Sequence, residues 1–348
     1  MRGVWFSVCL LVVGPSLISG QGFAAQPASP YFSGKTLTLT VGAARGSDAD
    51  LYARLTAKYF GRHLAGTPAV VVEDKPENGG HEAAAYLYSN APHDGTSIGE
   101  VPAVVLSAPL WSGWSSAGYE PPQFAYLGSA ASESAGCFVD GDSPIKSARD
   151  AFVSEVTLAA MADGGPTRDG PVLLNTLLGT KFRLVSKKGG IDAILQAIGR
   201  HEVTGACGLD WGTVARIKPD WLPKGVLRAI LQETVAGSPA ANRLGIPRAA
   251  DFVASREDRQ VLALAYAYQA FARPFMLPPG TPPELVAMMR NAFEQTLADK
   301  ALIAEAERGG LEIAPLSGAA VEARVAELYR APAPFAERVR AALSGVTQ

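Results

Sequence analysis

The sequence predicts an α/β protein built from two lobes. An alternating strand over 36–41 precedes a small-residue loop, Gly42–Gly46, and a helix that Ser47–Asp50 opens. Units of strand, glycine-rich loop and helix recur in the second half, after strands expected over 156–161 and 182–186. Period two marks the strands, and apolar residues at helical spacing mark the helices. Because both halves contain such units, we expect two lobes that face each other across a cleft.

The first half continues with the same rhythm. The run 69–73 is expected to be a buried strand, 79–88 a helix, 90–95 a turn and 96–101 the next strand. A strand–helix–strand order favours a mostly parallel sheet. Trp111–Pro122 is rich in Ser, Gly and Pro and is expected to be a surface loop.

The second half is predicted in the same way, and its C-terminal part is helical. The expected strands are 124–128, 136–139, 156–161, 182–186 and 203–209. The expected loops are 163–167 and 187–190, and the expected helices are 171–178, 191–201, 285–297, 302–306 and 321–329.

Composition and missing motifs exclude several functions. The chain has 348 residues and a net charge of −2, and it lacks the basic and aromatic pattern of nucleic-acid-binding proteins. Its four histidines have neither zinc-ligand spacing nor a cysteine pair nearby. No nucleophile elbow or phosphate-binding loop is present. We therefore expect no catalytic residue, no metal and no cofactor.

The N-terminus has the features of a secretory signal peptide. Arg2 precedes an apolar run, Val4–Ile18, and small residues follow as far as Ala25. An uncleaved anchor is the alternative, but Pro15 interrupts the run, which is short for a membrane span. Cleavage of residues 1–25 would leave an exported protein.

Removal of the leader also removes Cys9 and leaves Cys137 and Cys207. An oxidising compartment would permit a disulfide between them. Both cysteines lie in strand-like apolar segments, and this context favours buried free thiols instead.

The loops that follow the strands are candidates for binding an anion. Free N–H groups and the dipole at a helix start favour negative charge, and Ser47 with Asp50 resembles a capping box. Arg45, Arg168 and Lys188 lie in such loops, and a guanidinium suits a carboxylate. Each cation could equally be a solvated surface charge. The predicted ligand-binding residues are Ala43, Ala44, Arg45, Gly46, Ser47, Gly164, Gly165, Pro166, Thr167, Arg168, Lys188, Gly189, Gly190 and Asp210. For Asp210, simple capping of the next helix is an equal alternative.

Several motifs together resemble the periplasmic receptors of tripartite tricarboxylate transporters, the Bug-type proteins. Their order and spacing cover nearly all of the mature chain. They are Asp50-x-x-Ala53-Arg54-Leu55, Val70-Val71-Val72-Glu73-Asp74-Lys75-Pro76-x-x-Gly79-Gly80, Ala91-Pro92-His93-Asp94-Gly95-Thr96, Lys188-Gly189-Gly190 and Pro278-Pro279-Gly280-Thr281-Pro282. The chain departs from the family in its first loop, where Ala43-Ala44-Arg45 replaces a proline- and glycine-rich segment, and at Lys187, where a tyrosine is frequent.

The resemblance implies a type II periplasmic binding protein, with two α/β lobes joined by two crossing strands. Lobe 1 would comprise 26–131 and 266–348, and lobe 2 would comprise 132–265. Such a protein is periplasmic and monomeric, holds a small carboxylated solute through loop N–H groups, and delivers it to the membrane components of the transporter. An orphan or signalling binding protein and a secreted enzyme on the same scaffold are the alternatives.

Overall fold

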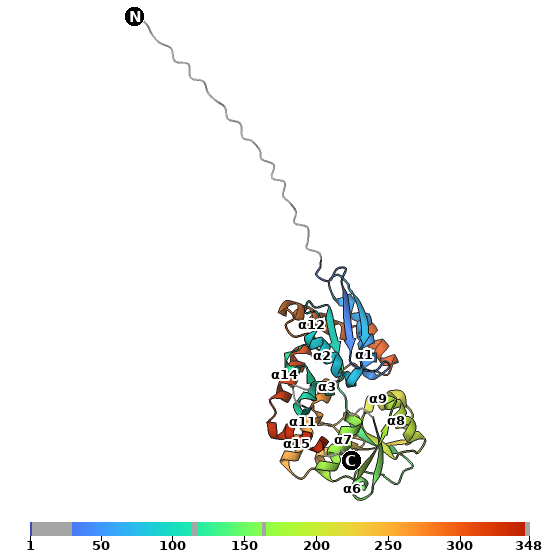
Figure 1. Ribbon diagram of the computed structural model, residues 1–348. Coiled ribbons are helices and arrows are strands. Elements are labelled where there is room, and N and C mark those ends of the chain that lie inside the picture. The colour runs from blue at the N-terminus through green and yellow to red at the C-terminus, as the bar shows by residue number, and fades with distance from the viewer. Residues whose placement is uncertain (2–29, 113–116, 162–164, 345–348) are drawn as a thin grey trace.

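The computed structural model describes Met1 and residues 30–112, 117–161 and 165–344 (Figure 1). The expected signal peptide, residues 1–25, lies outside the described residues apart from Met1. Within the described parts, no helix is both long enough and apolar enough to cross a membrane.

The first lobe is built on a six-stranded sheet with the order β11-β4-β10-β3-β1-β2. β1 pairs in parallel with β2 and β3, whereas β10 is antiparallel to β3 and β4. The strands are β1 (Thr36–Val41), β2 (Ala69–Asp74), β3 (Ser97–Glu100), β4 (Ala125–Ser129), β10 (Pro274–Leu277) and β11 (Leu316–Ser317).

The second lobe is built on a five-stranded sheet with the order β7-β6-β8-β5-β9. β6 is parallel to β7 and β8, and β5 is antiparallel to β8 and β9. The strands are β5 (Ala135–Asp140), β6 (Val156–Met161), β7 (Phe182–Lys187), β8 (Gly205–Asp210) and β9 (Leu227–Gln232). The expectation of a mostly parallel sheet is wrong in part. β5 and β10 are the first strands after the chain crosses from one lobe to the other, and both run antiparallel to their neighbours.

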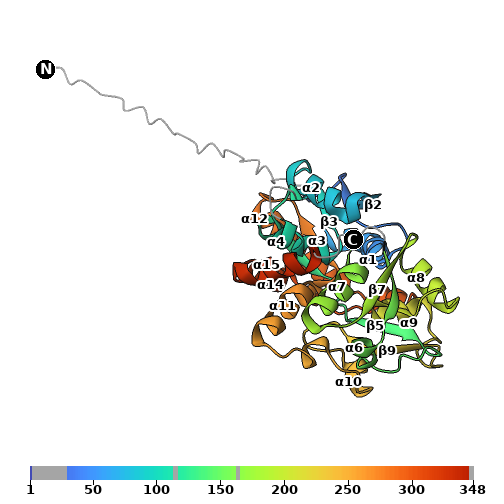
Figure 2. The same ribbon diagram turned by 60° about the horizontal axis from the view of Figure 1, so that its bottom comes forward.

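Helices cover both sheets, and the C-terminal helices lie along both lobes (Figures 1 and 2). The helix α15 packs against α4 of the first lobe and also against α7 and α11. The longer helices are α1 (Asp48–Phe60), α2 (His81–Ser89), α7 (Pro166–Leu178), α8 (Gly190–Gly199), α9 (Trp211–Ile217), α11 (Arg256–Tyr266), α12 (Pro283–Leu297), α13 (Lys300–Arg308), α14 (Gly318–Tyr329) and α15 (Ala333–Ser344). The short ones include α3 (Ala103–Ser107), α4 (Pro109–Ser112), α6 (Asp150–Val153) and α10 (Pro239–Arg243).

Two segments connect the lobes and lie side by side. Ala130 N–H donates to the Arg273 carbonyl at 2.9 Å, and Glu133 N–H donates to the Gln269 carbonyl at 2.9 Å. The first connection leads directly from β4 into β5, and the second contains a 3₁₀ helix, Ala267–Phe271. The sequence analysis expected two crossing strands between the lobes. The structure instead has a short segment that is not a strand and, beside it, a 3₁₀ helix.

Several elements differ from the sequence-based expectation. β2 is an edge strand rather than a buried one, and Val71 is 44% exposed, because β2 has a neighbour on one side only. The expected loop 111–122 begins inside α4 and contains the buried Tyr119. The helix α7 begins at Pro166, five residues before the expected start at Pro171, because proline fits the first turn of a helix.

Candidate functional site

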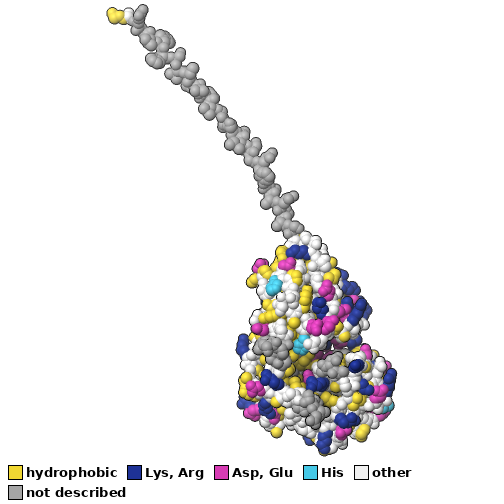
Figure 3. Space-filling model, in the orientation of Figure 1, with side chains coloured by type: hydrophobic (Ala, Val, Ile, Leu, Met, Phe, Trp, Pro, Cys, Tyr) yellow, Lys and Arg dark blue, Asp and Glu magenta, His cyan; other side chains and the backbone are white. Residues whose placement is uncertain are grey.

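The two lobes meet where the first turn of α1 faces α9. The Asp48 carboxylate accepts a hydrogen bond from the Thr213 hydroxyl and forms an ion pair with Arg216. These side chains follow β1 in one sheet and β8 in the other, so the contact joins the lobes. The surface view shows a recess between the lobes with charged side chains near it (Figure 3).

Beside this contact, Arg273 is surrounded by carboxylates. Its Nη1 lies 3.5 Å from Glu133 Oε2, and its Nη2 lies 3.9 Å from Asp48 Oδ2. Glu100, at the end of β3, is completely buried, and neither of its carboxyl oxygens has a hydrogen-bond partner among the described residues. Burial raises the pKa of Glu100 to about 8 and that of Glu133 to about 7, although Arg273 opposes both shifts.

Two residues of the loop after β1 form hydrogen bonds with the helix α1 that follows it. Ala43 is buried, whereas Ala44, Arg45 and Gly46 are exposed. Ser47 caps α1 and accepts from Asp50 N–H at 3.4 Å. The Asp50 carboxylate accepts from Gly46 N–H at 2.8 Å instead of from Ser47, so the expected capping box is displaced by one residue. Arg45 has no partner among the described residues and is free to meet a ligand.

The second predicted loop, after β6, is largely helical. Gly164 lies outside the described residues. Gly165 precedes α7 with a φ of 82°, and Pro166 begins the helix. The Thr167 hydroxyl accepts from Met161 N–H at 2.9 Å, and Arg168 Nη1 lies 3.0 Å from Asp169 Oδ1.

The remaining predicted residues are either exposed or already hydrogen-bonded within the protein. Lys188, Gly189 and Gly190 are exposed at the start of α8. Asp210 caps α9: its carboxylate accepts from Thr213 N–H and from Ser134 N–H, each at 2.9 Å. Because Ser134 belongs to a connection between the lobes, Asp210 ties α9 to that connection. The capping alternative thus describes the observed role of Asp210.

A small cavity of about 30 Å³ lies beside these loops, and sequence reasoning missed it. Val104 and Trp111 line it from the first lobe, and Pro166 and Asp169 line it from α7. Glu233, the residue directly after β9, also lines it. A charged residue at the end of an apolar strand was the available signal, because polar side chains there face the cleft of an α/β fold.

Glu233 is almost completely buried and only half satisfied. Its Oε2 accepts from Gly208 N–H at 2.5 Å, whereas Oε1 has no hydrogen-bond partner within the described ranges of the chain. Burial raises the pKa of Glu233 to about 7, and the Gly208 hydrogen bond opposes that shift. Burial also raises the pKa of Asp169 to about 6, against the lowering effect of Arg168.

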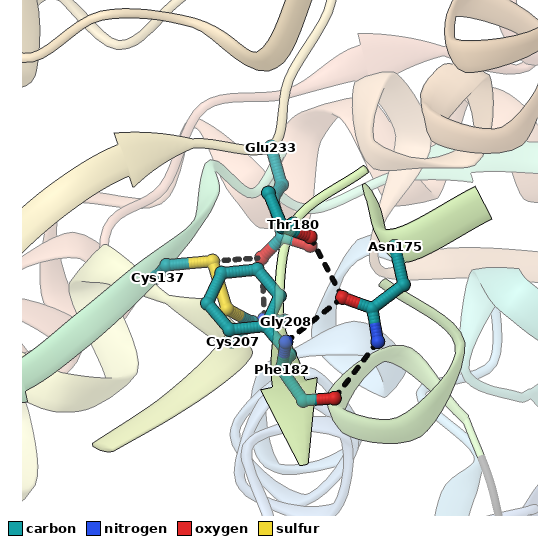
Figure 4. The surroundings of a disulfide bond; sticks show 7 residues. All are labelled: Cys137, Asn175, Thr180, Phe182, Cys207, Gly208 and Glu233. Carbon is teal, nitrogen blue, oxygen red and sulfur yellow. Dashed lines mark hydrogen bonds between the residues drawn. A yellow bond between two sulfur atoms is a disulfide. The ribbon is translucent and has the colours of Figure 1, made fainter. Parts of the chain in front are cut away.

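Cys137 and Cys207 form a disulfide, so the expectation of free thiols is wrong (Figure 4). They lie on the adjacent antiparallel strands β5 and β8, with Cα atoms 3.9 Å apart. Sheet pairing, which the sequence pattern did not reveal, brings the two sulfurs together. Glu233 Oε2 lies 3.7 Å from Cys137 Sγ, and a disulfide sulfur carries no hydrogen, so this is a packing contact. Among the described residues these three are the only group of potential metal ligands, and the disulfide occupies both sulfurs.

Solved structures with the same fold include proteins named as solute-binding or periplasmic binding proteins. A TctC solute-binding protein from Polaromonas matches with a TM-score of 0.62 and 16% identity, over 87% of this chain and 97% of that one. The periplasmic binding protein BugD matches with a TM-score of 0.64 and 21% identity, over 88% and 97%. MatC from Rhodopseudomonas palustris, with bound malate, matches with 0.60 and 19%, over 88% and 98%. No protein-family model and no curated protein sequence matches the chain.

The chain thus has the two-lobed fold of the type II periplasmic binding proteins, as the sequence motifs predicted. The similar structures include TctC and BugD, which are the kind of receptor that those motifs resemble. At this level of identity the likeness establishes the fold, and the ligand has to be argued from the residues of this chain.

Proposed function

We propose that this protein is a divergent receptor of the tripartite tricarboxylate type that captures a small carboxylated solute in the periplasm. The observation that carries the proposal is the meeting of α1 and α9, where Asp48 of one lobe binds Thr213 and Arg216 of the other. A contact of this kind, across a two-lobed fold, suits a protein that opens and closes around a solute.

The carboxylate of the solute would bind near the loop after β1. Arg45 is exposed and has no partner in the described part of the chain, and a guanidinium matches a carboxylate in geometry and charge. Lys188 and the backbone of Gly189 and Gly190 would approach from the other lobe. Arg168 contributes less in this scheme, because its guanidinium already pairs with Asp169.

Calorimetry on the exported protein tests this proposal. Succinate, malate, adipate and citrate would be titrated, with a neutral sugar as the control. Saturable binding of at least one of the acids is expected. If none of the acids binds or raises the melting temperature, the proposal fails.

The partners and location follow from the same proposal. Mass spectrometry of the exported protein should give an N-terminus between Gly20 and Ser29. The mature chain is proposed to be a monomer with lobes 26–131 plus 266–348 and 132–265. It would deliver solute to large and small membrane components of the transporter, and loss of the gene should then abolish uptake of the bound acid. Normal uptake would instead favour an orphan or signalling receptor.

A secreted enzyme on the same scaffold is the less favoured alternative. The structural neighbours are named as binding proteins. Turnover of carboxylate esters by the purified protein would favour the enzyme.

A further inference from the structure

The junction between the lobes brings together more acidic than basic side chains. The carboxyls that face Arg273 there belong to Asp48, Glu100, Glu133 and Asp210. Asp48 also pairs with Arg216. If all these groups are ionised, four carboxylates face two guanidinium groups, and two negative charges are left unbalanced among the described residues.

The neighbouring titratable groups do not remove this excess. Asp50, on α1, faces Glu100 and pairs with Arg54, whose Nε lies 2.7 Å from Asp50 Oδ1. Arg54 also binds Asp74, at 2.6 Å, so its positive charge is already balanced. The uncharged titratable groups that face the cluster are the hydroxyls of Tyr52 and Tyr268.

Water cannot stabilise these charges where the lobes are in contact. Glu100 is completely buried, and both of its carboxyl oxygens are without a hydrogen bond in the described part of the chain. The side chains of Arg273, Glu133 and Asp48 are each at most 14% exposed. An excess of like charge is costly in such a place, because burial weakens dielectric screening.

The contacts single out Glu100 and Glu133 as the groups that would take up protons. Hydrogen bonds to an ionised carboxylate stabilise that form. Asp48 has such bonds from Thr213 and Arg216. Asp210 accepts from two backbone N–H groups, each at 2.9 Å. Glu133 has only a long contact of 3.5 Å to Arg273, and the Glu100 oxygens have none among the described residues.

The cluster is assembled from both lobes. Asp48 and Glu100 belong to α1 and β3 of the first lobe, and Asp210 precedes α9 of the second. Glu133 and Arg273 lie in the two connections between the lobes. Separation of the lobes would part these groups and let water reach them. The unbalanced charge therefore opposes the closed form and not the open one.

We propose that closing the two lobes takes up protons at Glu100 and Glu133, so that acidic pH favours the closed form and alkaline pH favours the open form. The inference rests on the opening and closing that the proposed function requires, and it does not depend on the identity of the solute.

The direction follows from the burial of the two carboxyls. Burial raises the pKa of Glu100 to about 8 and that of Glu133 to about 7, although Arg273 opposes both shifts. In an open, hydrated junction each pKa would return towards the ordinary value of 4.5. The stabilisation of the closed form is therefore complete below that pH and is lost as pH rises through 7 and 8.

Small-angle scattering of the solute-free exported protein tests the inference. The radius of gyration would be measured from pH 6 to pH 9, and circular dichroism would confirm that the protein stays folded. A larger radius is expected at pH 9 than at pH 6, and the change should reverse when the sample is returned to pH 6.

Variants locate the effect. Glu100→Gln keeps the shape of the side chain but cannot ionise, so the increase in radius should be reduced. Glu133→Gln should reduce it in the same way, and it provides a second measurement if Glu100→Gln does not fold. Glu257→Gln removes an exposed carboxyl from α11 and is the matched control, so it should open like the wild type.

The outcomes separate this inference from the proposed function. Equal radii at pH 6 and pH 9 in the wild type would overturn the proton-linked closure. So would a wild-type increase in radius in both folded variants, Glu100→Gln and Glu133→Gln. Neither result decides whether a carboxylated solute binds, which the titrations with acids test separately.

Discussion

At the scale of residues, the lobe junction holds carboxyls whose protonation depends on folding. Burial raises the pKa of Glu100 to about 8 from the ordinary value of 4.5. The folded protein therefore binds more protons than the unfolded chain between these pH values. Where that holds, the free energy of unfolding falls as pH rises. Glu133 and Glu233 act in the same direction.

We predict that the free energy of unfolding decreases between pH 5 and pH 8. The variant Glu100→Gln should show a smaller decrease, because each proton difference contributes up to about 1.4 kcal/mol per pH unit. Urea denaturation at several pH values measures these slopes. Glu257→Gln, an exposed substitution, should retain the wild-type slope. Identical slopes in wild type and Glu100→Gln would contradict the prediction.

Arg45 provides a second prediction at this scale. If it holds a solute carboxylate, Arg45→Ala should weaken binding roughly ten- to a hundredfold, because a charge-assisted hydrogen bond is lost. Arg256→Ala removes another exposed arginine, from α11, and should have no effect. Calorimetry with the same acid measures both variants. Unchanged affinity in folded Arg45→Ala would mean that the arginine is only a solvated surface charge.

At the scale of elements, the disulfide joins β5 and β8 across 70 residues of sequence. In the chain-entropy account it restricts the unfolded chain more than the folded one. We predict that replacing Cys137 and Cys207 by alanine lowers the free energy of unfolding by about 2–4 kcal/mol. Urea denaturation with and without a reductant measures this loss.

The reductant provides the control for that experiment. It should destabilise the wild type by a similar amount and leave the double variant unaffected. A wild-type denaturation midpoint that does not respond to the reductant, together with two titratable thiols, would show that the cysteines are free.

At the scale of the whole molecule, Asp48, Thr213 and Arg216 join α1 of one lobe to α9 of the other, beside the two connections. We predict that Arg216→Ala shifts the ligand-free protein towards an open form, because an ion pair that joins the two lobes is removed. Small-angle scattering should then give a larger radius of gyration, and a bound solute should restore the smaller value. Arg256→Ala should scatter like the wild type. An unchanged radius in Arg216→Ala would show that this contact does not control closure.

The sequence by itself determined the local elements of this protein. The alternating strand β1 and the strands β4, β6 and β7 lie where they were expected to within a residue, and Ser47 caps α1 as predicted. These signals are local, since alternation, helical spacing and capping depend on residues a few positions apart. The family motifs extended these local predictions to the two-lobed fold, because the order of the motifs along the chain reflects the order of the strand–loop–helix units.

Only the tertiary structure decided which distant residues meet. Strand pairing brings Cys137 to Cys207, and the fold places Glu233 against Gly170 of α7. It also pairs Asp210 with Ser134 and Asp48 with Arg216, and it leaves Arg45 without a partner among the residues that the structure describes. The charge and burial of a group depend on its neighbours in space, and these come from segments far apart in the sequence. The cavity beside Glu233 is therefore a property of the folded chain alone.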